Sequence, residues 1–251
     1  MLLAIDAGNS NIKLALFDGA NLLAQSRLPS VLTRTSDEYA AELGNLTQFA
    51  VQVEAVLIAS VVPALNPILA SLAEEYFKRS PMFVDHTTSA GLKILYDSPA
   101  ELGADRIVDA VAAVAKYGAP CIVIDFGTAT TFNAINAAGE FLGGAISPGL
   151  TTCSEALFAR AAKLPRVKFE KPARVIGAST IAAMQSGIYY GYAGLVDGLL
   201  EKMIAELSET PHVIATGGLA RAIAPASKYI EHVDDALTLE GLRLVYERIK
   251  T

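Results

Sequence analysis

Apolar and polar positions alternate along the first half of the chain in short blocks that end at Gly, Pro, Asp or Ser. Continuous apolar blocks are typical of buried strands, and apolar positions three and four residues apart are typical of helices. This pattern predicts strands at 2–6, 11–17, 21–28, 54–59 and 82–84, and helices at about 36–49, 64–78 and 105–117. The segment 85–99 shows neither period and is predicted to be irregular.

The second half repeats this order of elements. It predicts strands at 121–125, 129–137, 140–146 and 212–215, and helices at about 150–162, 179–207 and 238–249. Three antiparallel strands, a helix, a further strand and a helix, occurring twice, indicate an α/β fold of two duplicated half-domains with mixed sheets flanked by helices. We therefore expect an N-terminal half-domain over residues 1–117 and a C-terminal half-domain over residues 118–251.

A short motif occurs near the start of each half. The chain reads Ile5-Asp6-Ala7-Gly8-Asn9-Ser10-Asn11 in the first half and Ile124-Asp125-Phe126-Gly127-Thr128-Ala129-Thr130 in the second. Each motif joins two apolar runs and predicts a strand, a tight glycine turn and a returning strand. Such a turn can bind an anion through its amides and hydroxyls, and its Asp can hold a cation. Two of these hairpins suggest two facing halves that grip one nucleotide.

Composition narrows the class of protein. Hydrophobic residues make up 52% of the 251 residues, but there is no run of about 18 uncharged apolar residues, so no membrane span is predicted. The N-terminus lacks a basic segment and is not predicted to be a signal peptide, which favours a cytoplasmic protein. The net charge of −6 argues against nucleic acid as the main partner.

The cysteines and histidines give no sign of a metal site. Cys121 and Cys153 lack a Cys-x-x-Cys partner, and both are predicted to be core thiols. The three histidines, His86, His212 and His232, show no metal-ligand spacing, so no zinc site is predicted.

Charged residues near the predicted turns are candidates for chemistry. Asp105 stands at the predicted start of a helix, where an Asp is most often a cap satisfied by amide donors. Between two nucleotide-binding hairpins it could also accept a proton from a substrate hydroxyl that attacks a γ-phosphate. Arg106 beside it could bind a substrate carboxylate in bidentate fashion. Lys13 is either a ligand of phosphate or a solvated strand lysine.

Glycines mark three further segments. The glycine-rich segment 143–149 lies at the end of a predicted strand, and the segment 216–218 follows another predicted strand. Each segment either forms a close-packed turn or lines a nucleotide cleft with backbone amides. Within the long predicted helix, glycines recur at spacings of four, three and four, at Gly187, Gly191, Gly194 and Gly198. Since Gly costs about 1 kcal/mol per helical site relative to Ala, a packing reason is expected, either inside the chain or at a subunit interface.

Together these motifs resemble those of the type III pantothenate kinases, a bacterial branch of the superfamily of actin, sugar kinases and acetate kinase. The matches, in order, are 6–10, 103–106, 125–131 and 143–149, then Gly177-Ala178-Ser179-Thr180 followed by Gly187 and Gly191. The resemblance covers essentially the whole chain and implies an actin-like (ribonuclease H-like) fold for each half. Ser10 stands where many members have Thr, which keeps the hydroxyl group.

The resemblance implies ATP-dependent phosphorylation of pantothenate at its primary hydroxyl to 4'-phosphopantothenate, the first step of coenzyme A biosynthesis. Asp105 would be the general base. The residues implied to contact the nucleotide are Asp6, Ala7, Gly8, Asn9, Ser10, Asn11, Ile12, Lys13 and Thr128. Those implied to contact pantothenate are Tyr96, Gly103, Ala104, Asp105, Arg106 and Thr180.

The resemblance also implies cations and a second subunit. Asp125 would bind a monovalent cation, K⁺ or NH₄⁺, and Asp6 is a candidate contact to the Mg²⁺ or similar divalent ion that accompanies ATP. Homodimers are the family norm, so the expected partners are pantothenate, ATP and a second copy of the chain.

Two other functions stay open at this point. The residues without the resemblance reach only an ATP-dependent kinase of a small hydroxylated acid. Another small-molecule kinase of the same superfamily would keep both hairpins and the base. A non-enzymatic nucleotide-binding regulatory protein of the actin type would keep the hairpins but would need no base at Asp105.

Overall fold

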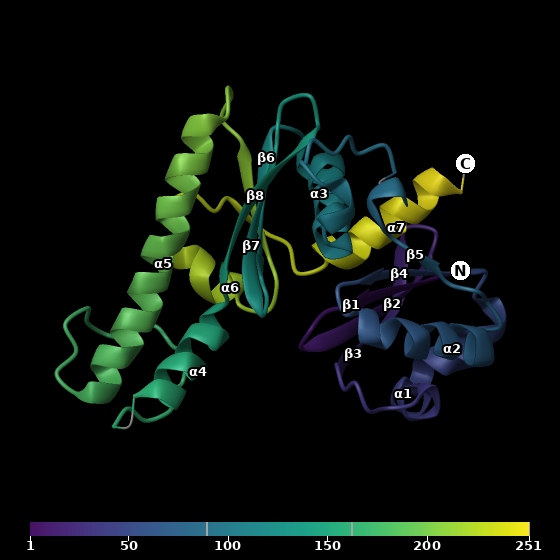
Figure 1. Cartoon of the computed structure of the whole chain (residues 1–251), viewed down its shortest axis with the longest axis horizontal. Coiled ribbons are helices and arrows are strands. Elements are labelled where there is room, and N and C mark those ends of the chain that lie inside the picture. The colour runs from purple at the N-terminus through teal and green to yellow at the C-terminus, as the bar shows by residue number, and fades with distance from the viewer. Residues whose placement is uncertain (89, 162, 251) are drawn as a thin grey trace. The chain divides into compact units, whose positions relative to one another are not determined.

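The computed structural model describes residues 1–88, 90–161 and 163–250, and it divides into two compact units (Figure 1). Unit 1 contains Met1–Ala115 and the segment from Ala236 onward, and unit 2 contains Lys116–Asp235. Each unit is built around one five-stranded sheet that mixes parallel and antiparallel neighbours. The predicted α/β class, with mixed sheets flanked by helices in two halves, is confirmed.

The sheet of unit 1 has the strand order β3-β2-β1-β4-β5. Its strands span Asn21–Pro29 (β3), Asn11–Asp18 (β2), Leu2–Ala7 (β1), Ala55–Ser60 (β4) and Met82–Phe83 (β5). The first three strands of the chain pair antiparallel, whereas β4 runs parallel to β1 and β5 runs parallel to β4. The central strand β1 is buried along its whole length, which accounts for its continuous apolar sequence.

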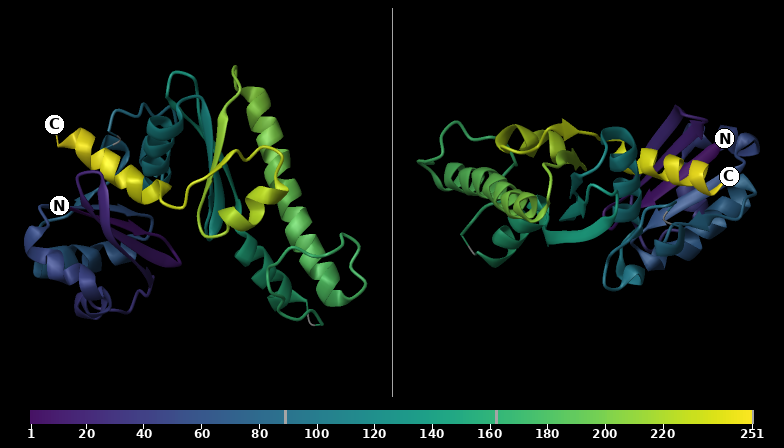
Figure 2. Two further views of the ribbon diagram at one scale, coloured as in Figure 1. Left: turned by 180° about the vertical axis from the view of Figure 1, so that it is seen from behind. Right: turned by 90° about the horizontal axis from the view of Figure 1, so that it is seen from above.

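Helices cover both faces of this sheet (Figures 1 and 2). They are α1 (Ser36–Glu42), α2 (Asn66–Phe77), α3 (Ala104–Tyr117) and α7 (Leu237–Ile249). Leu3 and Ile5 of β1 share a core cluster with Leu69 of α2, whereas α7 contacts β1, β2 and β4 on the other face. Because side chains alternate across a strand, Asp6 points to the face opposite Leu3 and Ile5.

The helix predicted at about 36–49 is wrong in its second half. It starts with a capping box, in which Glu38 N donates to Thr35 Oγ1 (3.3 Å) and Thr35 N donates to Glu38 Oε2 (2.8 Å). Gly44 then has φ +53°, a left-handed conformation that ends the α-helix at Glu42. The chain continues as a 3₁₀ helix over Gly44–Gln52.

The sheet of unit 2 repeats the topology of unit 1 with the order β10-β9-β6-β7-β8. Its strands span Cys121–Phe126 (β6), Ala129–Ile135 (β7), Phe141–Pro148 (β8), His212–Thr216 (β9) and His232–Val233 (β10). β9 runs parallel to β6 as β4 runs parallel to β1, so the predicted correspondence of these late strands is confirmed. The short strand β10 was not predicted.

Three helices accompany this sheet. They are α4 (Leu150–Arg160), α5 (Thr180–Glu206) and the short α6 (Ala220–Ile223). Val196 and Leu200 of α5 are fully buried in a cluster with Ile122 and Ile124 of β6. One face of α5 is therefore held by the core of unit 2.

The compact units differ from the predicted half-domains in one element, the C-terminal helix α7, which belongs to unit 1. Close packing on α3 explains this position. A Cβ placed on Gly241 of α7 would lie 2.2 Å from the carbonyl oxygen of Val108 in α3, so only glycine permits this approach of the two backbones.

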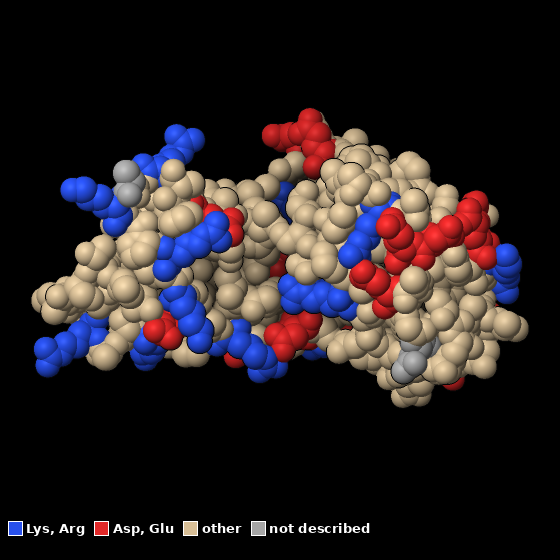
Figure 3. Space-filling model, turned by 90° about the horizontal axis from the view of Figure 1, so that it is seen from below, with Lys and Arg blue, Asp and Glu red and all other residues tan. Residues whose placement is uncertain are grey.

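The surface carries charges of both signs. On the face shown in Figure 3, Lys and Arg side chains lie interspersed with Asp and Glu side chains. Among the helices of the described residues, none has the length and apolar character that a membrane crossing requires.

The variant Gly241→Ala tests the contact between α7 and α3. The added methyl group must displace the Val108 backbone, and overpacking of this kind costs about 1–3 kcal/mol, which exceeds the gain of up to about 1 kcal/mol in helix propensity. We expect a lower urea midpoint for unfolding. Glu74→Ala, at an exposed position of α2, is the control and should unfold at the midpoint of the wild type. Equal stability of both variants would contradict the contact.

Candidate active site

The first hairpin of unit 1 joins β1 to β2 and carries an ion pair. Asp6 lies opposite Lys13 in the antiparallel ladder, and Lys13 Nζ is 3.1 Å from Asp6 Oδ2. Asp6 is buried and Lys13 is partly buried, so Lys13 is not a fully solvated strand lysine. The pair keeps a positive and a negative group at the base of the turn.

The turn between these strands exposes polar groups at its tip. Gly8 N donates to Asn11 O (3.0 Å), which closes the turn and leaves Asn9 and Ser10 exposed. Ser30, at the end of β3, donates its hydroxyl to Gly8 O (2.5 Å) and its amide to Ser10 O (3.1 Å). Sequence reasoning missed Ser30, because its role depends on the β2–β3 pairing and not on any motif.

Asp105 lies in the first turn of α3 and is partly buried. Burial raises the pKa of its carboxyl group, and the negative charge of Asp6 raises it further, against the opposing effects of the Arg106 amide and charge. Arg106 N donates to Asp105 Oδ1 (2.8 Å), a bond between adjacent residues, whereas an N-cap side chain accepts from the amide two or three residues on. The pKa of an ordinary cap would be lowered by its amide donors, so the pKa shift of Asp105 is opposite to that of a cap.

Gly103 makes room for this carboxyl group. A Cβ at position 103 would lie 2.6 Å from Asp105 Oδ1 and 3.3 Å from Cγ1 of Val61. The Gly-Ala-Asp-Arg motif therefore has a steric reason for its first residue. Within unit 1, the structure brings Asp105 close to Asp6, the partner of Lys13 in the first hairpin, although the sequence separates Asp105 widely from both.

Tyr96 and Arg106 also lie together in unit 1. The Cζ atom of Arg106 is 5.6 Å from the centroid of the Tyr96 ring, a cation–π distance, and Arg106 is only 6% exposed. The stacking holds the guanidinium plane in a defined orientation. Both residues belong to the set predicted to contact the acidic substrate.

The second hairpin lies in unit 2, between β6 and β7. Asp125 is near the end of β6, partly buried, and Thr128 is exposed at the tip of the turn. Gly127 N donates to Ala129 O (3.1 Å), two residues on, whereas Gly8 N of the first hairpin donates to Asn11 O, three residues on. Each turn is thus closed by its glycine amide, but the second turn is one residue shorter.

Both glycine-rich segments of unit 2 pack against this second turn. A Cβ on Gly149 would lie 2.4 Å from the carbonyl oxygens of Gly127 and Thr128. A Cβ on Gly217, which has φ +92°, would lie 2.3 Å from Asp125 Oδ1. These glycines are close-packed around the Asp125 turn, as one of the two sequence interpretations predicted.

Thr180 is the first residue of α5, and it lies apart from the Asp125 turn in a different feature of unit 2. It lines an apolar groove of about 700 Å³ between α4 and α5. Residues of both helices line this groove, among them Cys153, Leu157, Thr180, Gly187, Gly191 and Leu195. Cys153 is exposed, so the prediction of a core thiol is wrong for Cys153, because it lies on the groove side of α4; Cys121 is buried as predicted.

Comparison with known sequences identifies the family. The family model described as "Type III pantothenate kinase" matches residues 2–202. A type III pantothenate kinase of Geobacter sulfurreducens is 51% identical over 252 residues, covering 99% of each chain. That of Citrifermentans bemidjiense is 49% identical over 254 residues, covering 100% of each chain.

Comparison with solved structures concerns the fold. A putative Baf family transcriptional activator from Campylobacter jejuni has a TM-score of 0.61 at 19% identity, covering 99% of this chain and 100% of that one. The activator of 2-hydroxyisocaproyl-CoA dehydratase from Clostridium difficile, with bound ADPNP, has a TM-score of 0.59 at 13% identity, covering 99% and 96%. A putative N-acetylglucosamine kinase from Porphyromonas gingivalis has a TM-score of 0.53 at 12% identity, covering 100% of both chains.

These likenesses concern the fold alone, and together with the repeated sheet topology they confirm the predicted fold of two duplicated actin-like halves. The sequence identity of 51% and 49% to the two kinases named above, over essentially their full length, is evidence for the family as well as for the fold. Together with the family model, it shows that this chain belongs to the type III pantothenate kinase family.

Proposed function

We propose that this chain transfers the γ-phosphoryl group of ATP to the primary hydroxyl of pantothenate, with Asp105 as the general base. Family membership supports the reaction and the two substrates. The observation that supports the base is the partly buried Asp105 carboxyl group, whose pKa is raised by burial and by Asp6. The reaction consumes ATP, and we expect it in the cytoplasm.

Phosphoryl transfer asks a protein mainly for positioning and for neutralisation of charge. In unit 1, the turn at Gly8–Asn11 exposes small polar groups that suit phosphate oxygens. Lys13 supplies a positive charge beside them. The Asp6 carboxylate is an oxygen ligand of the kind that Mg²⁺ prefers, so these residues fit a nucleotide with its divalent ion. We assign Asp6 through Lys13, together with Thr128 of unit 2, to the nucleotide.

A general base must bind a proton more readily than an ordinary Asp does at neutral pH. The raised pKa moves Asp105 in that direction, since proton transfer improves as the pKa of the base approaches the working pH. The amide of Arg106 fixes one carboxylate oxygen at 2.8 Å, which leaves the other oxygen to take the proton from the substrate hydroxyl. Asp105 is thereby positioned as well as activated.

The acidic end of the substrate needs a cation and a shaped surface. We assign Arg106 to the pantothenate carboxylate, because its guanidinium is held over the Tyr96 ring. Gly103 and Ala104 precede the base and would offer backbone contacts, and Thr180 completes the assigned set.

Asp125 is our candidate ligand for a monovalent cation, K⁺ or NH₄⁺. Its carboxylate is partly buried at the end of β6, and Gly217 packs against its Oδ1 atom. Such packing fixes the oxygen in place, which is what a weakly bound ion needs from its ligands.

We also propose that the groove between α4 and α5 binds a second copy of the chain. Within the described residues, a methyl added at Gly187, Gly191, Gly194 or Gly198 would meet no atom within 4 Å, so packing inside this chain does not explain these glycines. The groove is lined mainly by apolar side chains, and Leu157 and Leu195 are 40% and 36% exposed. An apolar face of this kind is typical of homodimer interfaces.

The test of the function is formation of ADP by the purified protein with Mg²⁺ and ATP, with and without pantothenate. We expect turnover that depends on pantothenate and is faster in K⁺ than in Na⁺ buffer. Asp105→Asn should lower kcat by about 10²–10⁴ and leave ATP binding unchanged, because only proton transfer is lost. Asp97→Asn, in an exposed position, is the control and should leave kcat unchanged.

Three other outcomes would contradict the proposed substrate, the general base or the cation site. Bound ATP without turnover on pantothenate would favour a regulatory protein or a kinase for another hydroxyl. An unchanged kcat in Asp105→Asn would remove the base assignment. In Asp125→Asn, an unchanged ratio of the rates in K⁺ and Na⁺ would remove the cation site.

We expect the ionised Asp105 carboxylate, which serves the proposed activity, to lower the stability of the folded state. Because folding raises the pKa of Asp105, the ionised carboxylate destabilises the folded state once the pH exceeds the unfolded value of about 3.9. Asn keeps the acceptor for the Arg106 amide but carries no charge. Asp105→Asn should therefore have a higher Tm than the wild type at pH 8, and the difference should shrink as the pH falls to 5. Asp97→Asn should show no such trend. A lower Tm of Asp105→Asn at pH 8 would mean that Asp105 is an ordinary helix cap.

The dimer proposal is checked by light scattering coupled to gel filtration. Leu157→Glu places a charge in the apolar groove and should shift the protein from dimer to monomer at micromolar concentration. Leu22→Glu, on β3 with a similar exposure of 45%, is the control and should remain dimeric. A dimeric Leu157→Glu, or a monomeric wild type, would contradict the proposal.

A further inference from the structure

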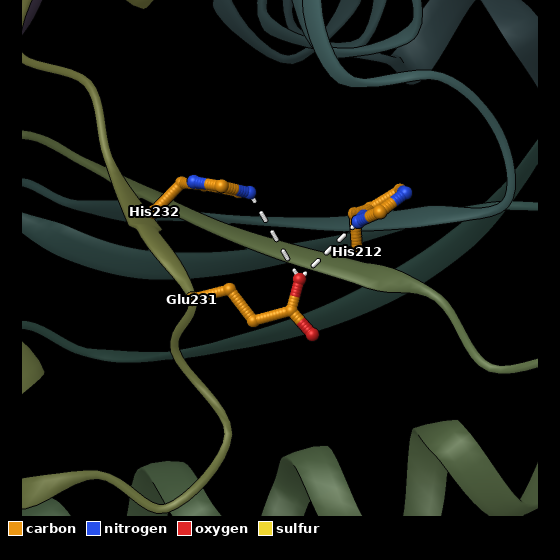
Figure 4. Close-up of side chains that lie close together, drawn as sticks. All are labelled: His212, Glu231 and His232. Carbon is orange, nitrogen blue, oxygen red and sulfur yellow. Dashed lines mark hydrogen bonds and ion pairs between the residues drawn. The ribbon is translucent and has the colours of Figure 1, made fainter.

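Two histidines and a glutamate meet on the surface of unit 2 (Figure 4). His212 Nδ1 is 3.2 Å from Glu231 Oε2, and His232 Nε2 is 4.0 Å from the same oxygen. One ligand atom from each of the three residues lies within 4.8 Å of the other two. Among the described residues, this is the one group of three or more His, Cys, Asp or Glu side chains that meets this criterion.

The sheet topology creates this cluster from residues that are distant in sequence. His212 is the first residue of β9, and His232 is the first residue of the parallel strand β10. Glu231 N donates to Val213 O (3.0 Å), which fixes Glu231 beside the start of β9. The three side chains therefore extend from one edge of the sheet, where parallel strands begin.

We propose that His212, Glu231 and His232 bind a divalent transition-metal ion of the zinc class. Two imidazole nitrogens and one carboxylate oxygen are ligands that Zn²⁺ and its neighbours prefer over Mg²⁺ or Ca²⁺. Tetrahedral coordination with bonds of about 2.0–2.2 Å places ligand atoms about 3.3–3.5 Å apart, so one pair already has the required spacing and the others need only small rotations. All three side chains are 44–50% exposed, so they can make these rotations and an ion can reach them.

Neighbouring residues restrain one of the ligands. The ring of Tyr117 stacks on His232 with centroids 4.7 Å apart and an interplanar angle of 26°. The Tyr117 hydroxyl in turn donates to Asp234 Oδ2 (3.0 Å), and Lys116 forms an ion pair with the same carboxylate. Restraint of a histidine ring by surrounding groups is a common support for metal ligands.

This cluster is separate from the candidate cation ligand of the same unit. In the β6–β9 ladder, His212 pairs with Cys121, and Thr216 pairs with Asp125. Four residues of strand correspond to about 13 Å, so the histidine cluster and Asp125 lie at opposite ends of the same strands. Metal binding here is thus independent of the proposed kinase reaction.

The experiment is a calorimetric titration of Zn²⁺ into untagged, EDTA-treated and dialysed protein, with excess Mg²⁺ present. We expect one saturable site per chain with Kd in the micromolar range or below. His212→Gln and His232→Gln should each weaken binding at least tenfold, and Glu231→Gln should weaken it by loss of charge. His86→Gln removes the remaining histidine of the chain, which lies in unit 1, and should bind as the wild type does.

Two further readouts make the result decisive. Co²⁺ should give visible absorption bands in the wild type and in His86→Gln, and weak or no bands in the cluster variants. The Tm without metal should be the same in all variants, because the exchanged side chains are exposed. The proposal is overturned if the wild type shows no saturable Zn²⁺ binding, or if His212→Gln and His232→Gln bind as tightly as His86→Gln.

Discussion

The burial of the Asp105 carboxyl group, next to the negative charge of Asp6, is the constraint on which the site of unit 1 depends. Two negative charges in a partly buried position are unfavourable unless something offsets them. Lys13 offsets the charge of Asp6 directly, at 3.1 Å, whereas backbone amides and the Arg106 charge offset that of Asp105 only in part. Burial therefore disfavours the ionised form of Asp105, and the pKa of its carboxyl group rises. A carboxylate kept in this state is poorly suited to stabilising the fold and well suited to accepting a proton.

Much of this site could be predicted from the sequence because its parts are local. The two hairpins follow from alternating runs around Asp-x-Gly turns, and the pairing of Asp6 with Lys13 is the register that such a hairpin gives. The closeness of Asp6 and Asp105 does not follow from local sequence, because it depends on which face of the sheet α3 covers. Motif order and the family resemblance indicated that closeness, whereas spacing along the chain did not.

Other features could not be read from the sequence, for reasons that are particular to each. The end of α1 depends on the left-handed backbone of Gly44, and a glycine inside an amphipathic pattern does not reveal its φ. The exposure of Cys153 depends on which side of α4 remains uncovered. His212 and His232 are brought together by the two-residue strand β10, which is too short to leave a hydrophobic pattern.

The two units repeat one topology, and in both a neighbouring hydroxyl and a backbone amide hold the turn. In unit 1, Ser30 donates its hydroxyl to Gly8 O and its amide to Ser10 O. In unit 2, Thr152 donates its hydroxyl to Thr128 O (2.8 Å), and Gly149 N donates to the same oxygen (3.0 Å). Unit 2 adds the close packing of Gly149 and Gly217 against its turn, so neither position accepts an added side chain.

The four glycines on one face of α5 also need a packing partner to offset their cost in helix stability. Each costs about 1 kcal/mol relative to alanine in a helix, so the four together cost about 4 kcal/mol, a large share of the stability of a typical domain. Gly241 offsets such a cost through its contact with α3, but Gly187, Gly191, Gly194 and Gly198 meet no described atom that could do so. This cost supports our proposal that another backbone packs against the four glycines, beside the apolar groove. A second copy of the chain, presenting the same glycines, would do so symmetrically.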